Sequence, residues 1–341
     1  FSNAVMWRAL IGKLSLFAAM ATSDSSTVVS SLKPFRVLTW NTLAPVYFRE
    51  RTGYREVMEA MHPKAYLARH RRICAAIAAC AADVVCLQEH WFQPQLAALY
   101  REQLGANGYL LEALQRTAWN CDGRSEDGVA VLVRSNSFEL VRRHDICFHD
   151  YGIPQDRVGV LLLLRHLCSE SDNEEQRTLA VLCTHLTYPH SRYDMEARKA
   201  QICACLDAAE RELPSGTPII VAGDLNGPSS DPVGQKLHAA GFQNAWETVH
   251  RQPCQITHLD HRGQNFASDH VWVRGPLVST DAQLLPEGTP DSEPLLRPSI
   301  GAVCKDAAES PDSEPAPPSR FEDWCALSDH RPLLAAFGWH G

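Results

Sequence analysis

Val221-Ala222-Gly223-Asp224-Leu225-Asn226 is the stretch that decides the fold, because an apolar run ends there in two polar side chains spaced to face one side of a strand. Ser328-Asp329-His330-Arg331-Pro332, near the C-terminus, has the same character. Three more apolar runs end in Thr39-Trp40-Asn41, Leu87-Gln88-Glu89 and Cys183-Thr184-His185. If these strand ends converge, they form a carboxylate-rich pocket with two histidines, which suits a hard divalent cation and phosphate-ester chemistry.

The composition is that of an ordinary globular protein. The chain has 341 residues, 45% of them hydrophobic and 21% charged, so one large α/β domain could use them all. The net charge of the chain is −8, whereas proteins that bind long nucleic acids usually carry an excess of basic residues. Either the basic residues of this chain cluster locally, or its substrate is short. The densest basic run is Arg69-His70-Arg71-Arg72, which we interpret as the solvated face of a helix.

The twelve cysteines are scattered, many of them inside apolar runs, and no C-x-x-C pair occurs. This distribution is typical of buried free thiols rather than of a disulfide framework, and it predicts a reducing compartment. Cys203 and Cys205 are too closely spaced for the usual zinc pattern and lie on a predicted helix.

Apolar and β-branched runs alternate with helical patterns along the chain, which predicts a two-sheet sandwich with helices outside. The predicted helices are 64–82, 95–104, 193–212 and 232–240, the last beginning at a proline that suits a first turn. The predicted strands are 36–40, 84–89, 109–114, 129–134, 157–167, 178–185, 218–223, 269–274 and 331–337.

Two segments differ from the rest in composition. Residues 1–33 are expected to be an extension, in which 6–23 carry basic residues without an acid, as in an organelle presequence or a disordered leader. The domain is expected to span 34–341. Within it, residues 281–320 are rich in Pro, Glu, Ser and Asp, so we expect a disordered, removable loop. No apolar run is long enough to span a membrane, and we expect an intracellular, cytoplasmic protein unless 6–23 direct it to an organelle.

The order of the polar strand ends resembles that of the endonuclease/exonuclease/phosphatase superfamily, the deoxyribonuclease-I-like proteins, over roughly residues 35–339. Thr39-Trp40-Asn41-Thr42-Leu43-Ala44 and Asp127-Gly128 are similar to the branch of carbon-catabolite-repressor deadenylases, nocturnin and Angel. His258-Leu259-Asp260-His261-Arg262-Gly263 and Pro189-His190 look closer to a plant and protist group. Some members of that group carry a calcium-binding EF-hand insert, but this chain has no Asp-x-Asp-x-Asp-Gly pattern.

The resemblance implies a four-layer α/β/β/α sandwich with a metal site at one end. It makes Glu89 the main ligand of Mg²⁺ or Mn²⁺, and a carboxylate at a sheet edge can serve so while waters fill the other positions. Asn41 would hold a metal-bound water or a phosphate oxygen without adding charge. Asp329 would be a carboxylate on the metal side or just behind it.

The resemblance also assigns the catalytic groups. Asp224 would activate or position the attacking water, Asn226 would steady the phosphate, and His185 would contact the scissile phosphate and stabilise its developing charge. Asp269 and His330 would form a dyad in which the carboxylate fixes the imidazole tautomer.

Ser-Asp-His occurs twice, at 268–270 and 328–330, so the choice of partners is ambiguous. Relatives usually have an aromatic or apolar residue where this chain has His270. His270 would therefore either contact the substrate or be a structural histidine. Asp127 would orient a catalytic group or be a plain turn acid. The substrate end would include Arg157 and His190, with weaker candidates in Arg198, His258, His261 and Arg262.

Together these features predict a metal-dependent phosphodiesterase, a monomeric 3′→5′ exoribonuclease of the deadenylase type that acts on RNA or a nucleotide. A phosphatase for a small nucleotide is the nearest alternative, and the acidic net charge favours it. Hydrolysis of a lipid or inositol phosphate is a more distant one. A non-catalytic binding module is disfavoured because Glu89 and the Asp–His pair are all present.

Overall fold

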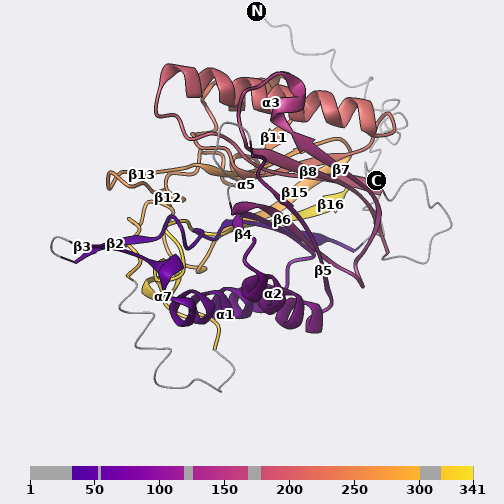
Figure 1. Cartoon of the computed structure of the whole chain (residues 1–341). Coiled ribbons are helices and arrows are strands. Elements are labelled where there is room, and N and C mark those ends of the chain that lie inside the picture. Colours follow the sequence, from indigo (N-terminus) through magenta and orange to yellow (C-terminus); the bar gives the residue numbers. More distant parts are fainter. Residues whose placement is uncertain (1–32, 53–54, 119–125, 168–177, 300–315, 341) are drawn as a thin grey trace, which may run out of the picture.

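The computed structural model describes residues 33–52, 55–118, 126–167, 178–299 and 316–340 (Figure 1). Two six-stranded sheets face each other. The first has the order β15 (Leu277–Leu284), β16 (Leu333–Trp339), β1 (Phe35–Asn41), β4 (Val84–Trp91), β6 (Asp127–Arg134) and β5 (Tyr109–Gln115). The second has the order β11 (Gln243–Asn244), β14 (Asp269–Arg274), β10 (Ile219–Asp224), β9 (Thr178–His185), β8 (Val158–His166) and β7 (Phe138–Cys147).

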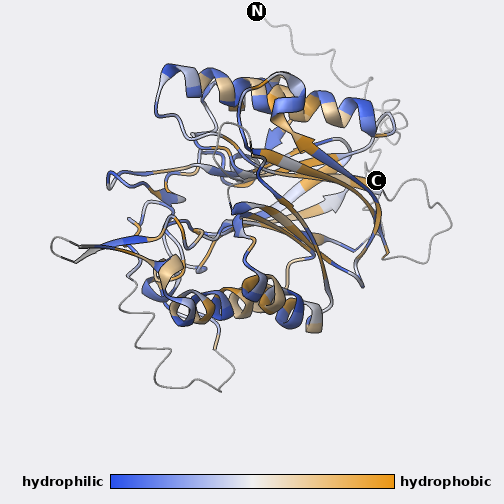
Figure 2. Cartoon of the chain, in the orientation of Figure 1, coloured by the Kyte–Doolittle hydropathy of each residue, from blue (hydrophilic) through white to orange (hydrophobic). Residues whose placement is uncertain are grey.

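The sheets lie between two helical layers, which confirms the predicted four-layer sandwich. Helices α1 (Pro63–Cys80) and α2 (Pro94–Ala106) cover the first sheet, and α3 (Arg192–Glu212) and α4 (Pro232–Ala239) cover the second (Figure 1). The central strands are apolar on both faces, as buried strands must be, whereas the helices turn hydrophilic sides outward (Figure 2).

Three apolar layers hold the sandwich together. Between the sheets, side chains such as Val37 and Val131 of the first pack with Val160 and Val271 of the second. A second cluster joins the outer face of the first sheet to α1 and α2, and a third joins the second sheet to α3 and α4. Smaller elements complete the described chain: β2 (Arg49–Thr52), β3 (Arg55–Met58), η1 (Glu59–Met61), η2 (Phe148–Tyr151), α5 (Ala245–His250), β12 (His258–Leu259), β13 (Asn265–Phe266) and α7 (Phe321–Cys325).

The helices begin where local chemistry places them. Pro63, Pro94 and Pro232 lie in first turns, where a missing N–H costs no hydrogen bond. Helix α3 starts with a capping box, because the Ser191 hydroxyl accepts from the Asp194 N–H while the Asp194 carboxylate accepts from the Ser191 N–H. All four predicted helices and all nine predicted strands are present within a few residues of the expected bounds.

Two long strands, β7 and β15, escaped prediction, and both lie at a sheet edge. One face of an edge strand can remain in solvent, so β7 carries Glu139, Arg142 and Arg143, and β15 carries Asp281 and Gln283. These polar residues break the apolar pattern that marks the other strands.

The expectation of a disordered loop over 281–320 is wrong for residues 281–299, while 300–315 lie outside the described residues. Residues 281–284 complete β15 and pair with β16, and Leu284, Leu285 and Leu295 are buried. The Arg331 guanidinium donates to the carbonyls of Leu285, Thr289 and Pro290 at 3.2, 3.3 and 2.8 Å. Composition failed here because a few leucines and one buried arginine fix this polar segment.

Removing residues 281–320 is therefore expected to destabilise the protein, contrary to the expectation from composition. Truncating one buried leucine costs about 2–5 kcal/mol, and a loss of about 1 kcal/mol lowers the Tm of a large domain by roughly 2 °C. We expect a Tm at least about 5 °C lower in thermal unfolding followed by circular dichroism. A deletion confined to 300–315 removes none of these contacts and serves as the control. Equal melting of the long deletion and the intact protein would contradict the packing described above.

The basic run on α1 is not simply the solvated face that its composition suggests. Arg69 is fully buried, and its Nε donates to both carboxylate oxygens of Glu59 at 2.9 and 3.1 Å. Its Nη1 donates to the carbonyls of Thr42 and Leu327, and its Nη2 to that of Leu43. Arg69 thus links the loop after β1 to the segment before Ser328. In the sequence, only the helical spacing of the apolar residues of α1 could have indicated that Arg69 faces inward.

Arg69→Met is expected to lower the free energy of unfolding by about 3–5 kcal/mol, because Glu59 would keep a buried, unpaired charge. Urea denaturation at neutral pH measures this. Arg71→Met, at an exposed position two residues along the same helix, is the matched control and should change stability by less than about 0.5 kcal/mol. If both variants unfold at the same urea concentration, the buried pair does not stabilise the protein.

Every cysteine in the described ranges is a free thiol, Cys203 and Cys205 included. Apart from Lys33, the N-terminal extension predicted over 1–33 lies outside the described residues. None of the described helices is long and apolar enough to cross a membrane.

Candidate active site

The polar strand ends converge at one end of the sandwich. Strands β1 and β4 are parallel neighbours, as are β9 and β10, so their carboxyl ends meet at a common edge. Asp224 ends β10 in register with His185 of β9, and it also faces Asp269 at the start of antiparallel β14. Gly223 permits this packing, because a Cβ there would lie 2.0 Å from the Thr184 carbonyl oxygen.

Glu89 is set apart from its strand by backbone geometry. The pairing of β4 with β6 shifts register between Gln88 and His90, and Glu89 has a φ of 56° in the left-handed region. Such a bulge re-aims a side chain, here away from the ladder and toward Asn41. Its Oε1 accepts from Asn41 Nδ2 at 3.1 Å and its Oε2 from the Ala44 N–H at 2.9 Å. Burial, with the Asp127 carboxylate nearby, raises the pKa of Glu89.

Asn41 joins the two sides of the site. Its amide nitrogen donates to Glu89 Oε1 and to Asp224 Oδ2, both at 3.1 Å, while its Oδ1 accepts from the Leu43 N–H at 3.0 Å. Both amide protons are thus used to hold two carboxylates together across the sandwich. The Oδ1 retains a lone pair for a cation or a water.

Asp269 and His330 lie together as the predicted dyad requires. His330 Nδ1 is 2.8 Å from Asp269 Oδ2, which also accepts from the hydroxyls of Thr257 at 2.7 Å and Ser268 at 3.0 Å. Burial acts to lower the pKa of His330, but Asp269, then Asp224 and Asp329, overcome it and raise that pKa to about 10. The first Ser-Asp-His motif therefore supplies the carboxylate and the second supplies the imidazole.

Asp224 is held ionised among imidazoles. Its Oδ2 is 3.2 Å from His185 Nε2 and 3.8 Å from His330 Nε2. Burial acts against ionisation, but these two imidazoles hold the pKa of Asp224 well below its ordinary value. Burial, with Arg157 next, lowers the pKa of His185. Asn226 lies in the same loop at a φ of 57°, and its amide nitrogen donates to the Leu186 carbonyl at 2.8 Å.

The Asp329 side chain is only partly exposed, and its Oδ1 is buried and has no hydrogen-bond partner. Burial raises its pKa to about 6. Glu89, Asp329 and the Asn41 amide offer oxygen atoms, the donor type that Mg²⁺ and Mn²⁺ prefer, and the Glu89 carboxylate lies near enough to help raise the pKa of Asp329. These residues would hold the cation that the strand-end pattern predicts.

The residues expected at the substrate end are dispersed. Arg157 lines a small pocket beside His185, Asp127 and Arg116, and its Nη1 is buried without a hydrogen-bond partner. His190 is exposed, and its ring lies 4.5 Å from that of Tyr188.

Asp127 and His270 are both held by specific contacts with neighbouring elements. Asp127 accepts from the hydroxyl of Tyr47 at 2.9 Å and pairs with Arg116, so it is more than a turn acid. His270 is a structural histidine: its Nε2 lies 2.9 Å from the Gly227 carbonyl and its Nδ1 3.4 Å from the Asn244 amide.

Other contacts could not be read from the sequence. Arg198 donates to the Leu225 carbonyl and to Asp231, which holds the loop between Asp224 and Asn226. His258, which the sequence placed only among weak candidates, stacks on His330 with ring centroids 3.8 Å apart. No pattern in the sequence pairs these residues, because their partners lie on separate elements.

A four-layer α/β/β/α sandwich with clustered carboxylates, an Asp–His dyad and oxygen donors at one end is typical of hydrolases that act on phosphate esters. The chain belongs to the Endonuclease/Exonuclease/phosphatase family, whose sequence model matches residues 38–330. Members of this family are hydrolases of phosphate esters and generally depend on a divalent metal.

The sequence relatives agree with this assignment. An uncharacterised calcium-binding protein of Arabidopsis thaliana is 28% identical over 276 residues, which are 77% of this chain and 55% of that protein. Protein angel of Drosophila melanogaster is 28% identical over 158 residues, covering 44% of this chain and 41% of its own. The chain thus spans about half the length of the curated relatives that it matches.

Solved structures share the fold. ANGEL2, described as a 2′,3′-cyclic phosphatase, matches with a TM-score of 0.62 and 19% identity over 92% of this chain and 98% of its own. The human Nocturnin catalytic domain matches with a TM-score of 0.59 and 20% identity over 90% of this chain and 93% of its own. These likenesses show the shared fold. The sequence relatives, Protein angel among them, place the chain near the branch that its motifs resemble.

Proposed function

We propose that the chain is a Mg²⁺-dependent phosphodiesterase that removes nucleotides from the 3′ end of RNA by in-line attack of water. The observation that carries the proposal is the Asn41 amide, which joins Glu89 to Asp224 opposite the Asp269–His330 pair. This arrangement sets a cation-binding carboxylate, a water-positioning carboxylate and a cationic imidazole around one point.

Each polar side chain of the site has a separate role in the proposed reaction. Asp224, ionised and flanked by His185, accepts a hydrogen bond from the attacking water and orients it toward phosphorus. His330, held protonated by Asp269, donates through Nε2 to a phosphoryl oxygen whose charge grows in the transition state. His185 Nε2 donates to Asp224 Oδ2, 3.2 Å away, and so holds this carboxylate in place. The Asn226 amide fixes the loop after β10 by donating to the Leu186 carbonyl. A cation bound by Glu89, Asn41 and Asp329 would supply charge neutralisation at the phosphate.

A cluster of three rings favours a nucleotide over an inositol or lipid phosphate. Tyr188, His190 and His261 lie within 4.5–5.7 Å of one another, centroid to centroid. The Tyr188 hydroxyl donates to Asp260 at 3.0 Å, which fixes one ring, and both histidines are exposed. Exposed planar rings can stack on a nucleobase, whose flat π face a sugar ring or an acyl chain lacks.

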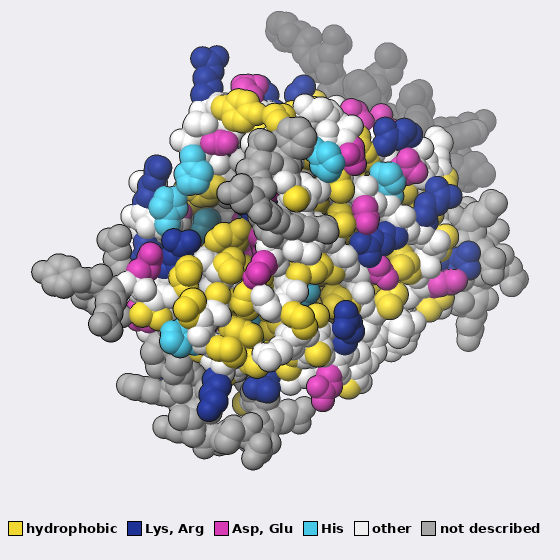
Figure 3. All heavy atoms as spheres, viewed as in Figure 1, with side chains coloured by type: hydrophobic (Ala, Val, Ile, Leu, Met, Phe, Trp, Pro, Cys, Tyr) yellow, Lys and Arg dark blue, Asp and Glu magenta, His cyan; other side chains and the backbone are white. Residues whose placement is uncertain are grey.

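A phosphatase acting on a small nucleotide is the second candidate, and surface charge favours it. The net charge is −8, and Lys and Arg are scattered among acidic and apolar side chains on the face seen in Figure 3. A long RNA needs a basic track along its phosphates, whereas a short 3′ end or a free nucleotide does not. The similarity to ANGEL2, a 2′,3′-cyclic phosphatase, points in the same direction.

A substrate screen of the purified protein with Mg²⁺ or Mn²⁺ tests these proposals. It compares poly(A), mixed RNA with a 3′-hydroxyl or a 2′,3′-cyclic phosphate end, DNA, NADP and inositol phosphates. Stepwise shortening of RNA from the 3′ end supports the exoribonuclease, and release of phosphate or ring opening without shortening supports the phosphatase. Preference for inositol phosphates, or no turnover of any substrate, would overturn the nucleotide assignment.

A further inference from the structure

The backbone of His330 is held by two side chains to which the proposed reaction gives no role. Its carbonyl accepts from the indole Nε1 of Trp40 at 3.1 Å, and its N–H donates to the hydroxyl of Ser328 at 3.1 Å. The Ser328 hydroxyl in turn donates to the carbonyl of Asn41 at 2.7 Å. Both side chains are buried. Trp40 and Ser328 therefore connect the peptide groups on both sides of His330 to the end of β1.

These contacts begin where the sheet stops joining the two segments. The antiparallel ladder between β1 and β16 ends at the pair Thr39–Leu333. Pro332, the residue before Leu333, has no N–H with which to extend it. His330 thus lies beyond the ladder, so its position relative to Asn41 depends on side-chain hydrogen bonds.

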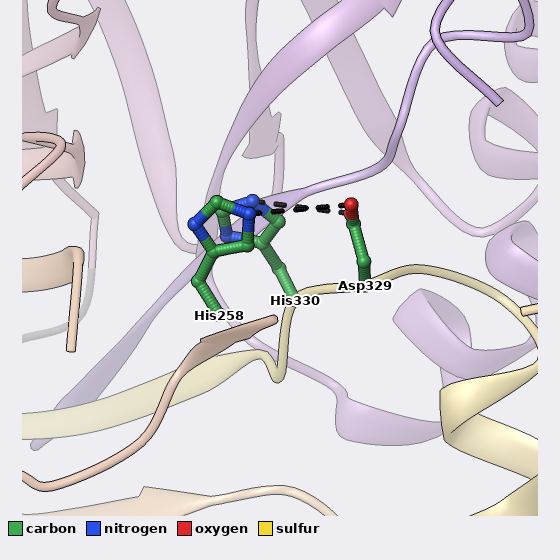
Figure 4. A group of neighbouring side chains, drawn as sticks. All are labelled: His258, Asp329 and His330. Carbon is green, nitrogen blue, oxygen red and sulfur yellow. Dashed lines mark ion pairs between the residues drawn. The ribbon is translucent and has the colours of Figure 1, made fainter. Parts of the chain in front are cut away.

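The ring of His330 is fixed separately from its backbone. Figure 4 shows the His258 ring lying against it, beside Asp329, with ring centroids 3.8 Å apart. Asp269 Oδ2 is 2.8 Å from its Nδ1. These partners belong to β12 and β14, so they orient the ring without linking it directly to Asn41 on β1.

We propose that Ser328 and Trp40 are positioning residues, which hold His330 at a fixed distance from Asn41 on the cation-binding side of the site. The inference rests on the proposed function, in which His330 donates to a phosphoryl oxygen while a cation neutralises the same phosphate. Reacting groups must be held to within about 0.5 Å of their working geometry, and a misplacement of about 1 Å can lower the rate by ~10²-fold.

The two serines of the repeated Ser-Asp-His motif then have different roles. Ser268 donates to Asp269 at 3.0 Å and so supports the carboxylate of the dyad. Ser328 instead joins the backbone of His330 to that of Asn41. The same three letters thus serve the dyad in one copy and the alignment of the two sides of the site in the other.

The geometry is tested first, without any substrate, by amide hydrogen exchange of the full chain followed by NMR. In Ser328→Ala the His330 amide loses its acceptor and should exchange at least about tenfold faster, the scale of one lost hydrogen bond. Ser137→Ala is the matched control, because Ser137 is a buried serine that donates to Asp83 at 2.7 Å, at the opposite end of β4 from Glu89. It should leave the His330 amide unchanged. An unchanged rate in Ser328→Ala would overturn the proposed contact.

Catalysis is tested with the substrate found in the screen. Ser328→Ala should lower kcat at least about tenfold while KM stays within about twofold, because misplacement weakens the transition state more than substrate binding. Trp40→Phe removes the indole N–H but keeps an aromatic ring, so it should also lower kcat with little change in KM. It is the second variant in case the first does not fold. Trp324→Phe is its control, since that ring packs 5.5 Å from Trp40 and its Nε1 is buried without a hydrogen-bond partner.

The controls separate positioning from stability. The Tm of all four variants is measured by circular dichroism, and Ser137→Ala and Trp324→Phe should keep the kcat of the parent even where their Tm falls. Equal kcat in each variant and its control, or a rise in KM alone, would overturn the positioning role. If the parent turns over no substrate, the proposed function fails, and hydrogen exchange alone decides whether Ser328 holds His330.

Discussion

Glu89→Gln should lower kcat by at least ~10²-fold while leaving the fold intact, which is the scale of losing one major electrostatic group from a reacting site. The substitution removes a negative charge without changing volume. Its amide oxygen can still accept one of the two hydrogen bonds that Glu89 receives from Asn41 and Ala44. Because the bulge aims residue 89 at this position whatever its charge, the loss should come from the cation and not from a displaced strand.

The measurement is a Mg²⁺ titration of kcat with the best substrate, together with thermal unfolding. The concentration of Mg²⁺ for half-maximal activity should rise, and the Tm should stay within a few degrees. Glu102→Gln, at an exposed position on α2, is the matched control and should behave as the parent does. Near-normal kcat of Glu89→Gln at saturating Mg²⁺ would show that Glu89 is not the main metal ligand.

The sequence located the candidate site because strand ends obey a simple rule. Apolar runs end in polar residues at the sheet edge, so the pattern alone places Asn41, Glu89, His185 and Asp224 together. The apolar runs did not predict that the Glu89 side chain turns out of β4. This orientation depends on a left-handed φ at Glu89, which the amino-acid composition does not reveal. Nor could they show that Asn41 uses both amide protons on carboxylates from different sheets.

Residues that act through tertiary contacts were the ones misjudged. Arg69 resembled a surface residue because its neighbours in sequence are basic, yet Glu59 and three carbonyls satisfy it in the interior. The polar segment after β15 resembled disorder because composition averages over residues and cannot see that Arg331 binds its carbonyls. In both cases one buried arginine satisfies backbone groups that would otherwise need water.

Asp269→Asn and His330→Ala should be strongly non-additive. Each alone is expected to lower kcat/KM by at least ~10²-fold, and the double variant should be no slower than His330→Ala alone. The reason is geometric: Asp269 Oδ2 meets His330 Nδ1 at 2.8 Å, so the carboxylate acts through the imidazole that it orients. Once the ring is gone, the carboxylate has no further catalytic task.

A double-mutant cycle on kcat/KM measures this coupling. Thr257→Val is a useful companion, because it removes the hydroxyl that donates to Asp269 at 2.7 Å without replacing either member of the dyad. The same hydroxyl accepts from the N–H groups of Ser268 and Asp269 at 2.9 and 3.0 Å, so the stability of this variant is measured together with its rate. Its effect should be smaller than that of Asp269→Asn and should also vanish in the His330→Ala background. Loss of folding in any variant is detected by circular dichroism before kinetics are compared.

Losses that multiply independently in the double variant would break the dyad and reopen the choice between the two Ser-Asp-His motifs. His270 would then be the residue to change, although both its ring nitrogens already have partners in the Gly227 carbonyl and the Asn244 amide. With no ring nitrogen free, His270 can reach a substrate only if the loop at Gly227 moves. His270→Gln should therefore cost stability rather than kcat/KM, and the opposite result would make His270, in place of His330, the imidazole that contacts the phosphate.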